Sequence, residues 1–392
     1  QGRLAHARSA RKRVEEVRPQ ARAQTFSVLQ TLRLRFQLFA DLILIAAGLF
    51  AALWHPDARW VEDAFSNGWY PRWQNFLGAF TAPFPFSLGD WVVLAGVLVL
   101  SAKLARNIAR MRRGRFGLPL LRLLFGSGGL TGFYALWFYA GWGWGYARAP
   151  LQTRVAYDAS RLTPANLDAL RRRAVAQINR LAPLAHAQQS AASRDAALSI
   201  ELLRNAWLPV VQRLGDRWRP DVAPAKFTLA GFFMDRNGTS GFTSPFTLET
   251  QLAPDLLWFE LPFDQAHEWS HAAGFNREDE ANYIAALTCM RDSDTIAQYS
   301  GWLDIFLYLP ALPNYPHKMF VRQVWEDFAA LRKRNAQFVN VNFSRLSWRM
   351  YNSYLKSNRI ASGVRNYGEV TRLLLTVPLD RQGLPLPADT NR

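Results

Sequence analysis

Two histidines spaced four residues apart are the side chains of this chain best suited to bind a metal ion. His267 and His271 flank Glu268 in the pattern H-E-x-x-H. On a helix, residues four apart lie on one face, so both imidazoles can bind a single ion. The carboxylate of Glu268 can take a proton from water bound to that ion. The pattern is typical of zinc hydrolases and predicts Zn²⁺ as the cofactor.

The segments around this motif predict two helices joined by a tight turn. Pro262 suits the first turn of a helix and Gly274 suits its end. The acidic residues 278–280 then open a second helix that extends to about Met290. The chain must therefore turn back directly after the histidines, which allows the second helix to supply a further ligand.

A hydrolytic zinc site has three protein ligands and one open position for water. Glu280 lies on the apolar face of the second helix, with Tyr283, Ile284 and Leu287. We therefore expect Glu280 to point towards the packed side and to be the third ligand. Glu278 is the alternative ligand, although a charge in the first turn also stabilises a helix without binding anything.

A peptide-hydrolysing site also needs a donor for the oxyanion and a segment that aligns the substrate. Tyr367 and Tyr299, each close to a glycine, are the candidate donors, and a buried structural role is the alternative for both. The segment 241–249 could supply an edge strand, which Pro245 favours. Glu249 would bind the substrate N-terminus or, alternatively, lie in solvent.

The remaining metal-binding side chain types suggest no second site. The chain has one cysteine, Cys289, so it can form no internal disulfide and offers no cysteine-based metal site. We interpret this cysteine, His186 and His317 as structural.

The basic charge of the chain is concentrated beside apolar segments. The formal net charge is +17. Residues 1–36 hold nine Lys/Arg against two acids, and residues 103–122 hold seven Lys/Arg and no acid. Membrane proteins carry positive charge in such positions, on the cytoplasmic side of their spans. The charge therefore predicts a lipid bilayer as a partner and no nucleic acid.

Three apolar segments predict transmembrane helices at residues 36–54, about 91–103 and about 123–146. The positive-inside rule places the N-terminus and residues 103–122 in the cytoplasm and residues 55–90 outside. The chain after about residue 147, which includes the H-E-x-x-H motif, is then extracytoplasmic.

The predicted fold is mainly α, with three N-terminal transmembrane helices followed by an α+β soluble domain with a small sheet. We expect a basic cytoplasmic segment at 1–35, the transmembrane region at 36–146, the extracytoplasmic domain at 147–376 and a frayed tail at 377–392. Short strands are expected within 226–261, where glycines and phenylalanines are frequent.

The motif and the triplet Glu280-Ala281-Asn282 resemble the gluzincin class of zinc metallopeptidases, and the compact minigluzincins in particular. The third ligand of minigluzincins is the Glu of such a triplet, so the resemblance implies Glu280. It also implies a zincin-like fold for 147–376. Trp269-Ser270 stand inside the motif where a small apolar pair is expected, a departure that leaves the ligands unchanged.

A larger part of the chain resembles an uncharacterised bacterial family of polytopic membrane proteins, identified only as a domain of unknown function. The shared segments are 85–90, 261–282, 299–301 and 363–368. This resemblance implies a metallopeptidase of the bacterial cytoplasmic (inner) membrane whose catalytic domain faces the periplasm or the exterior. It leaves the substrate unspecified.

Together these features favour a membrane-anchored zinc metallopeptidase that acts on a peptide or protein substrate, with Glu268 as the general base. The first alternative is a non-catalytic membrane receptor or scaffold with a structural zinc site, which would not need Glu268. The second alternative is an intramembrane protease. Polar residues on both sides of the motif argue against it, because they leave no apolar run of about 18 residues there.

Overall fold

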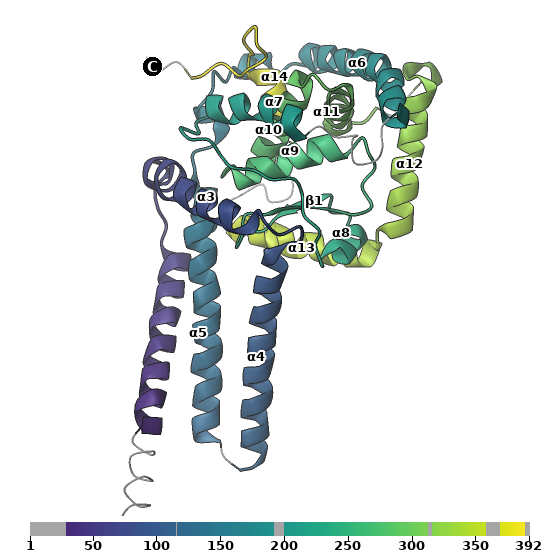
Figure 1. Ribbon diagram of the computed structural model, residues 1–392. Helices are drawn as coiled ribbons and strands as arrows, with labels where there is room; N and C mark the ends of the chain where they lie inside the picture. The colour runs from purple at the N-terminus through teal and green to yellow at the C-terminus, as the bar shows by residue number, and fades with distance from the viewer. Residues whose placement is uncertain (1–28, 115, 192–199, 313–315, 358–368, 389–392) are drawn as a thin grey trace, which may run out of the picture. The chain divides into compact units, whose positions relative to one another are not determined.

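The computed structural model describes residues 29–114, 116–191, 200–312, 316–357 and 369–388. By its contacts the chain divides into two compact units. Unit 1 comprises Gln1–Trp54 and Leu94–Trp137, and unit 2 comprises His55–Val93 and Phe138–Arg392. The chain is mainly helical with a small sheet, as the sequence predicts (Figure 1).

The described part of unit 1 consists of the N-terminal helix Leu29–Leu53, most of α4 (Leu88–Arg112) and most of α5 (Gly117–Gly141). Of all described helices, Leu29–Leu53 and α4 are long and apolar enough to cross a membrane. The structure thus gives two candidate spans where the sequence predicted three. The predicted third span does form one long helix, α5, but this helix is not among the two that are long and apolar enough to cross a membrane.

Glycines bring the backbones of α5 and the N-terminal helix into direct contact. A Cβ atom on Gly132 would lie 2.2 Å from the carbonyl oxygen of Leu44, and one on Gly48 would lie 2.5 Å from the Cα of Gly132. Because any larger side chain would separate the two backbones here, these positions require glycine. Small residues at helix contacts are typical of packing between transmembrane helices.

Unit 2 begins with elements that precede α4 in the sequence. These are α2 (Ala58–Trp60), the π-helical segment Val61–Trp69 and α3 (Tyr70–Thr81). After α5 the chain makes short 3₁₀ turns at Gly143–Ala147, Leu151–Thr153 and Ala159–Arg161. The longer helices that follow are α6 (Pro164–Ala191), α7 (Ile200–Arg213), α9 (Leu261–Ala272), α10 (Glu278–Arg291), α11 (Thr295–Tyr308), α12 (Arg322–Phe338) and α13 (Val341–Ser357). Shorter helices are α8 (Gly231–Asn237), the 3₁₀ turn His317–Met319 and α14 (Val370–Thr376).

The sheet seen in the described residues of unit 2 is one antiparallel pair. Strand β1 (Gly241–Thr243) pairs with β2 (Thr250–Leu252), with Phe242 opposite Gln251. The predicted strands of 226–261 are therefore reduced to two of three residues each, and part of that region forms α8 instead.

Helix α9 lies at the centre of unit 2. It packs against α7, α10 and α11, and both strands pack against it (Figure 1). Helix α10 is buried along every residue from Glu278 to Cys289. A helix buried on all sides must pair its polar side chains within the protein, because an unpaired buried charge is costly. The polar residues of α10 therefore have specific partners, which are described below.

Several sequence expectations are confirmed at the level of single elements. A helix does begin at Pro164, and the motif helix and its successor occupy Leu261–Ala272 and Glu278–Arg291. Residues 377–388, expected as part of a frayed tail, instead pack on the unit. The amide of Ala156 donates to the carbonyl of Leu386 at 2.9 Å, and the side chain of Val377 is buried.

The unusual pair Trp269-Ser270 has a packing function. Trp269 is buried and donates its indole N–H to the carbonyl of Ala223 at 2.7 Å. The hydroxyl of Ser270 accepts the indole N–H of Trp207 at 3.1 Å and donates to the carbonyl of Ala266. The two residues thus join α9 to α7 and to the segment that precedes α8. Both are buried in the core of unit 2.

Replacing Ser270 by alanine should destabilise the protein, because the buried indole N–H of Trp207 would lose its acceptor. We expect Ser270→Ala to lower the free energy of unfolding by about 1–3 kcal/mol. Denaturant titration of detergent-solubilised protein measures this. The matched control is Ser353→Ala in α13, an exposed serine that also donates to its own helix. Equal effects of the two substitutions would contradict the expectation.

Candidate metal centre

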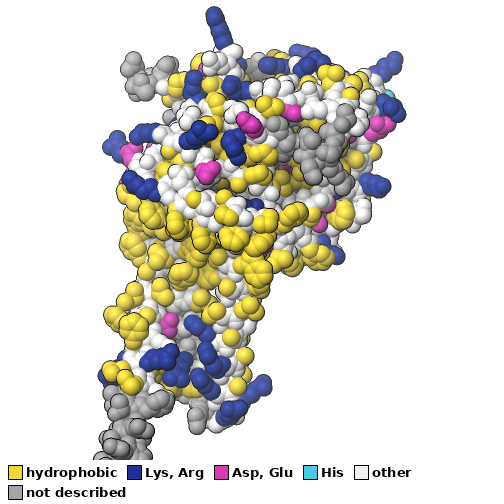
Figure 2. Space-filling view, in the orientation of Figure 1, with side chains coloured by type: hydrophobic (Ala, Val, Ile, Leu, Met, Phe, Trp, Pro, Cys, Tyr) yellow, Lys and Arg dark blue, Asp and Glu magenta, His cyan; other side chains and the backbone are white. Residues whose placement is uncertain are grey.

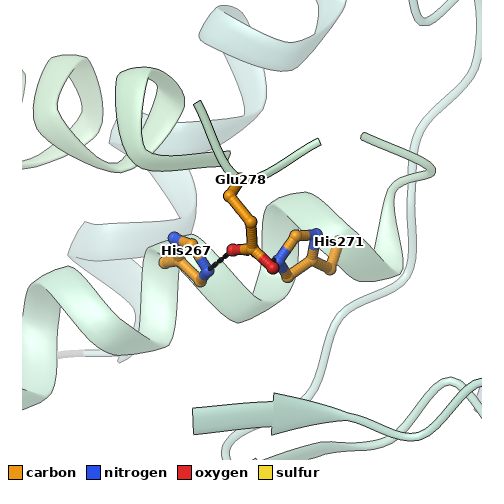
Figure 3. A group of neighbouring side chains, drawn as sticks. All are labelled: His267, His271 and Glu278. Atoms are coloured by element: carbon orange, nitrogen blue, oxygen red, sulfur yellow. Dashed lines mark ion pairs between the residues drawn. The ribbon is translucent and has the colours of Figure 1, made fainter. Parts of the chain in front are cut away.

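Three side chains from two consecutive helices converge on one point. His267 and His271 project from α9, and Glu278 is the first residue of α10. The Oε2 atom of Glu278 lies 3.3 Å from Nε2 of His267 and 3.4 Å from Nε2 of His271 (Figure 3). The turn between the helices contains Gly274 with φ of +92°, a conformation that favours glycine. All three side chains are buried.

The donor atoms of this group fit a zinc ion. They all lie within 4.8 Å of one another, and no other such group occurs among the described residues. Two ligands at about 2.0–2.1 Å from a tetrahedral ion are about 3.3 Å apart, close to the two distances from Glu278. The Oε2 atom of Glu278 and Nδ1 of His267 also lack hydrogen-bond partners among the described residues. A buried carboxylate oxygen without such a partner, facing two imidazole nitrogens, is what a cation site requires.

The tautomer of His271 follows from its second nitrogen. Nδ1 lies 2.8 Å from the carbonyl oxygen of Phe275, which can only accept, so Nδ1 carries the proton. In the neutral ring Nε2 is then unprotonated and has a lone pair available for a metal ion, and this atom is the one that faces Glu278. Such an outer hydrogen bond is typical of metal-binding histidines. Burial lowers the pKa of His271, but the Glu278 carboxylate outweighs it and raises that pKa to about 9.

The structure does not bring Glu280, the predicted third ligand, to the histidines; the carboxylate that lies beside them is that of Glu278, the alternative considered from the sequence. The carboxylate of Glu280 accepts the amide N–H of Leu151 at 2.9 Å and pairs with Arg154 at 3.2 Å. Glu280 does lie on the packed side of α10, as the sequence indicated. The first turn of α10, however, crosses α9 so that Glu278 faces the histidines and Glu280 faces the segment after α5.

Glu268 lies beside the group without being part of it. Burial raises its pKa, while His267 and His271 oppose that rise. The hydroxyl of Thr243 in β1 donates to its Oε2 atom at 2.7 Å. A Cβ atom on Gly241 would lie 2.4 Å from the other carboxylate oxygen, so this glycine leaves room for the carboxylate. Strand β1 therefore holds Glu268 in place, which the sequence did not predict.

A tyrosine distant in the sequence contacts the group. Tyr351 in α13 donates its hydroxyl to Oε1 of Glu278 at 2.6 Å. Of the two tyrosines proposed from the sequence, Tyr299 is buried and donates to Asp327 at 2.5 Å, which agrees with its structural alternative. Tyr367 lies outside the described residues. Helical periodicity alone could have placed Tyr351 on the inner face of α13, but not beside Glu278.

Other residues singled out in the sequence have partners away from the group. Glu249, expected to bind substrate or lie in solvent, is buried; it pairs with Lys226 at 2.9 Å and accepts the amide of Gly89 at 2.8 Å. His186 lies 3.0 Å from Asp327, and Cys289 is buried in the core, both in keeping with structural roles.

Measuring the zinc content of variants distinguishes Glu278 from Glu280 as the third ligand. We expect purified wild-type protein and Glu280→Gln to retain about one zinc per chain, because glutamine can still accept the Leu151 amide. Glu278→Gln and His267→Ala should lose the metal after dialysis. Inductively coupled plasma mass spectrometry measures the content. Zinc retained by Glu278→Gln but lost by Glu280→Gln would restore the assignment made from the sequence.

The contact from Tyr351 should tune metal affinity. Tyr351→Phe removes one hydrogen bond to the candidate ligand Glu278, and loss of such an outer partner weakens metal binding by about 10–100-fold. Competition with a zinc-chelating dye gives the affinity. Ser353→Ala, an exposed position on the same helix, is the control and should leave the affinity unchanged. Equal affinities for wild type and Tyr351→Phe would show that the hydroxyl does not support the ligand.

Comparison with protein-family models matches residues 65–375 to the family described as "Protein of unknown function (DUF3810)". No curated protein and no solved structure matches the chain. The matched region contains both histidines, Glu268 and both candidate third ligands. Since the match covers well over half of the chain, the protein belongs to the DUF3810 family of proteins of unknown function.

Proposed function

We propose that this protein is a membrane-anchored, zinc-dependent metallopeptidase with His267, His271 and Glu278 as the zinc ligands. One observation supports this above all: two imidazoles and a carboxylate converge at tetrahedral spacing while a further carboxylate, Glu268, lies next to them on the same helix. A structural metal site needs the three ligands but has no use for Glu268. The gluzincin-like pattern in the sequence supports the same assignment.

A zinc ion bound there would act as a Lewis acid and make a coordinated water easier to deprotonate. Glu268 would accept the proton of the attacking water and then deliver it to the leaving amine. Burial raises the pKa of the Glu268 carboxyl group. A raised pKa suits a carboxyl group that must both accept a proton and return it. The hydrogen bond from Thr243 fixes the side chain during both transfers.

Strand β1 is suited to align a peptide substrate. One edge of β1 pairs with β2, and no other described strand pairs with its second edge. A peptide added along this edge would lie beside Glu268, because Gly241 and Thr243 both contact that carboxylate. Backbone pairing of this kind binds peptides with little dependence on sequence.

The membrane anchoring rests on Leu29–Leu53 and α4, and we propose α5 as a third span. Its 25 residues correspond to about 37 Å of helix, enough for a bilayer, and its glycines pack directly on the N-terminal helix. With three spans and the basic segments inside, unit 2 would face the outside of a bacterial cytoplasmic membrane.

If Glu268 is the general base, its replacement should abolish peptide cleavage without removing the zinc. The full-length protein in detergent is incubated with a library of peptides, and new termini are identified by mass spectrometry. We expect Glu268→Gln to abolish cleavage, with a loss of at least about 10³-fold, while retaining its zinc. A chelator should abolish the wild-type cleavage, and zinc should restore it.

The matched control is Glu260→Gln, a partly buried carboxylate that precedes α9 and pairs with Arg334. It should retain cleavage in protein that remains folded. Zinc binding without any cleavage that depends on Glu268 would contradict the peptidase proposal and favour the receptor or scaffold with a structural site. Absence of zinc from the folded wild type would contradict both.

A further inference from the structure

Unit 2 carries a continuous apolar surface that its own core does not use. Exposed aromatic and aliphatic side chains gather over α3, α8 and α13 (Figure 2). We call the part around α8 and α13 the apolar rim; its exposed members are Phe227, Leu229, Phe232, Phe233, Val341, Phe343, Leu346 and Met350. Phe227 is 82% exposed and Met350 is 67% exposed. These side chains therefore lie on the surface of unit 2 and contribute little to its core. A contiguous patch of this kind marks an interaction surface.

The rim begins where a candidate membrane span begins. The amide of Ser87 donates to the carbonyl of Phe227 at 2.9 Å, and Asp90 accepts the amide of Leu229 at 2.6 Å. Ser87 directly precedes α4 and Asp90 lies in its first turn, and α4 is one of the two described helices apolar enough to cross a membrane. Phe227 and Leu229 therefore flank the point at which α4 leaves unit 2.

The same surface continues from this point to α13. Phe232 and Phe233 follow in α8, and the Phe233 ring lies 6.3 Å from the ring of Phe343 in α13. The hydroxyl of Ser344 donates to the carbonyl of Asn237, which fixes α13 against α8. The exposed apolar residues of both helices thus belong to one surface, connected by contacts within unit 2.

The charge of α13 indicates what covers this surface. The helix contains Arg345, Arg349 and Lys356 and no acidic residue. The two arginines are exposed beside Leu346 and Met350. A basic helix with an apolar face is typical of helices that lie in the interface of a bilayer with anionic lipids.

We infer that the apolar rim rests in the outer lipid leaflet beside α4, with α13 as an interfacial amphipathic helix. The inner face of α13 carries Tyr351, which contacts Glu278, and the buried Leu355. The metal centre would thus lie about one helix diameter, roughly 10 Å, from lipid. It follows that the substrates are polypeptide segments held close to the membrane; this consequence rests on the proposed peptidase function, whereas the lipid contact rests on the proposed anchoring alone.

Spin labels on single introduced cysteines test the lipid contact in the full-length protein. The native Cys289 is buried, so an exposed introduced cysteine reacts selectively. The protein is reconstituted into vesicles of phosphatidylcholine and phosphatidylglycerol. Label positions are Leu346→Cys, Met350→Cys and Phe232→Cys in the rim. Collision rates are measured with oxygen, which concentrates in lipid, and with a water-soluble nickel chelate.

We expect the rim labels to collide more with oxygen than with the nickel chelate, and the order to reverse at two matched controls. The controls are Leu184→Cys in α6 and Leu307→Cys in α11, which are 53% and 50% exposed, against 52% for Leu346. Rim labels that behave like these controls would overturn the inference. Rim labels shielded from both reagents would also overturn it, because a second protein copy would then cover the surface.

A label at Val97→Cys in α4 separates this inference from the proposed anchoring. Lipid-like collisions at Val97 with water-like collisions at the rim would refute the rim contact and leave the anchoring intact. Water-like collisions at both would refute both. Neither result depends on peptide cleavage, so failure of the catalytic proposal remains distinguishable.

Discussion

The arrangement of the candidate metal centre depends on keeping a carboxylate buried between two imidazoles. Glu278 has little contact with solvent, and charged groups in such surroundings are stable only when paired or bound to a metal. The histidines supply that pairing, and they hold the pKa of Glu278 well below its usual value although burial acts to raise it. Both helices must therefore stay fixed relative to one another, since a shift of either would leave a buried charge unpaired.

The surrounding structure holds these two helices from several sides. Glu280 fixes the first turn of α10 through the Leu151 amide and Arg154, and so supports the position of Glu278 from the same turn. Tyr70 donates to the carbonyl of Ala272 at the end of α9, and Trp269 and Ser270 hold the opposite face. Tyr351 contacts the carboxylate of Glu278 itself. The carboxylate is thus positioned by segments from both ends of the chain.

The segment between the first two predicted spans contributes to this support. Trp69 of this segment is 46% exposed. Tyr70 instead is 1% exposed and packs with Phe65 behind the end of α9. Adjacent residues of one helical stretch therefore face opposite environments, one towards the core beneath the metal centre and one outwards. This gives the elements next to α4 a direct connection to the site.

The sequence by itself determined the local features of this protein. It predicted the motif helix and its successor because caps, proline and glycine positions and helical periodicity act over a few residues. It also placed His267, Glu268 and His271 correctly on α9, since an i, i+4 spacing determines a shared face. Only the tertiary structure decided that Glu278 rather than Glu280 faces the histidines, because the crossing of α9 and α10 sets which part of the first turn of α10 points inwards. Thr243 and Tyr351 reach the site from 25 and 73 residues away along the chain, and no local pattern encodes contacts at such separations.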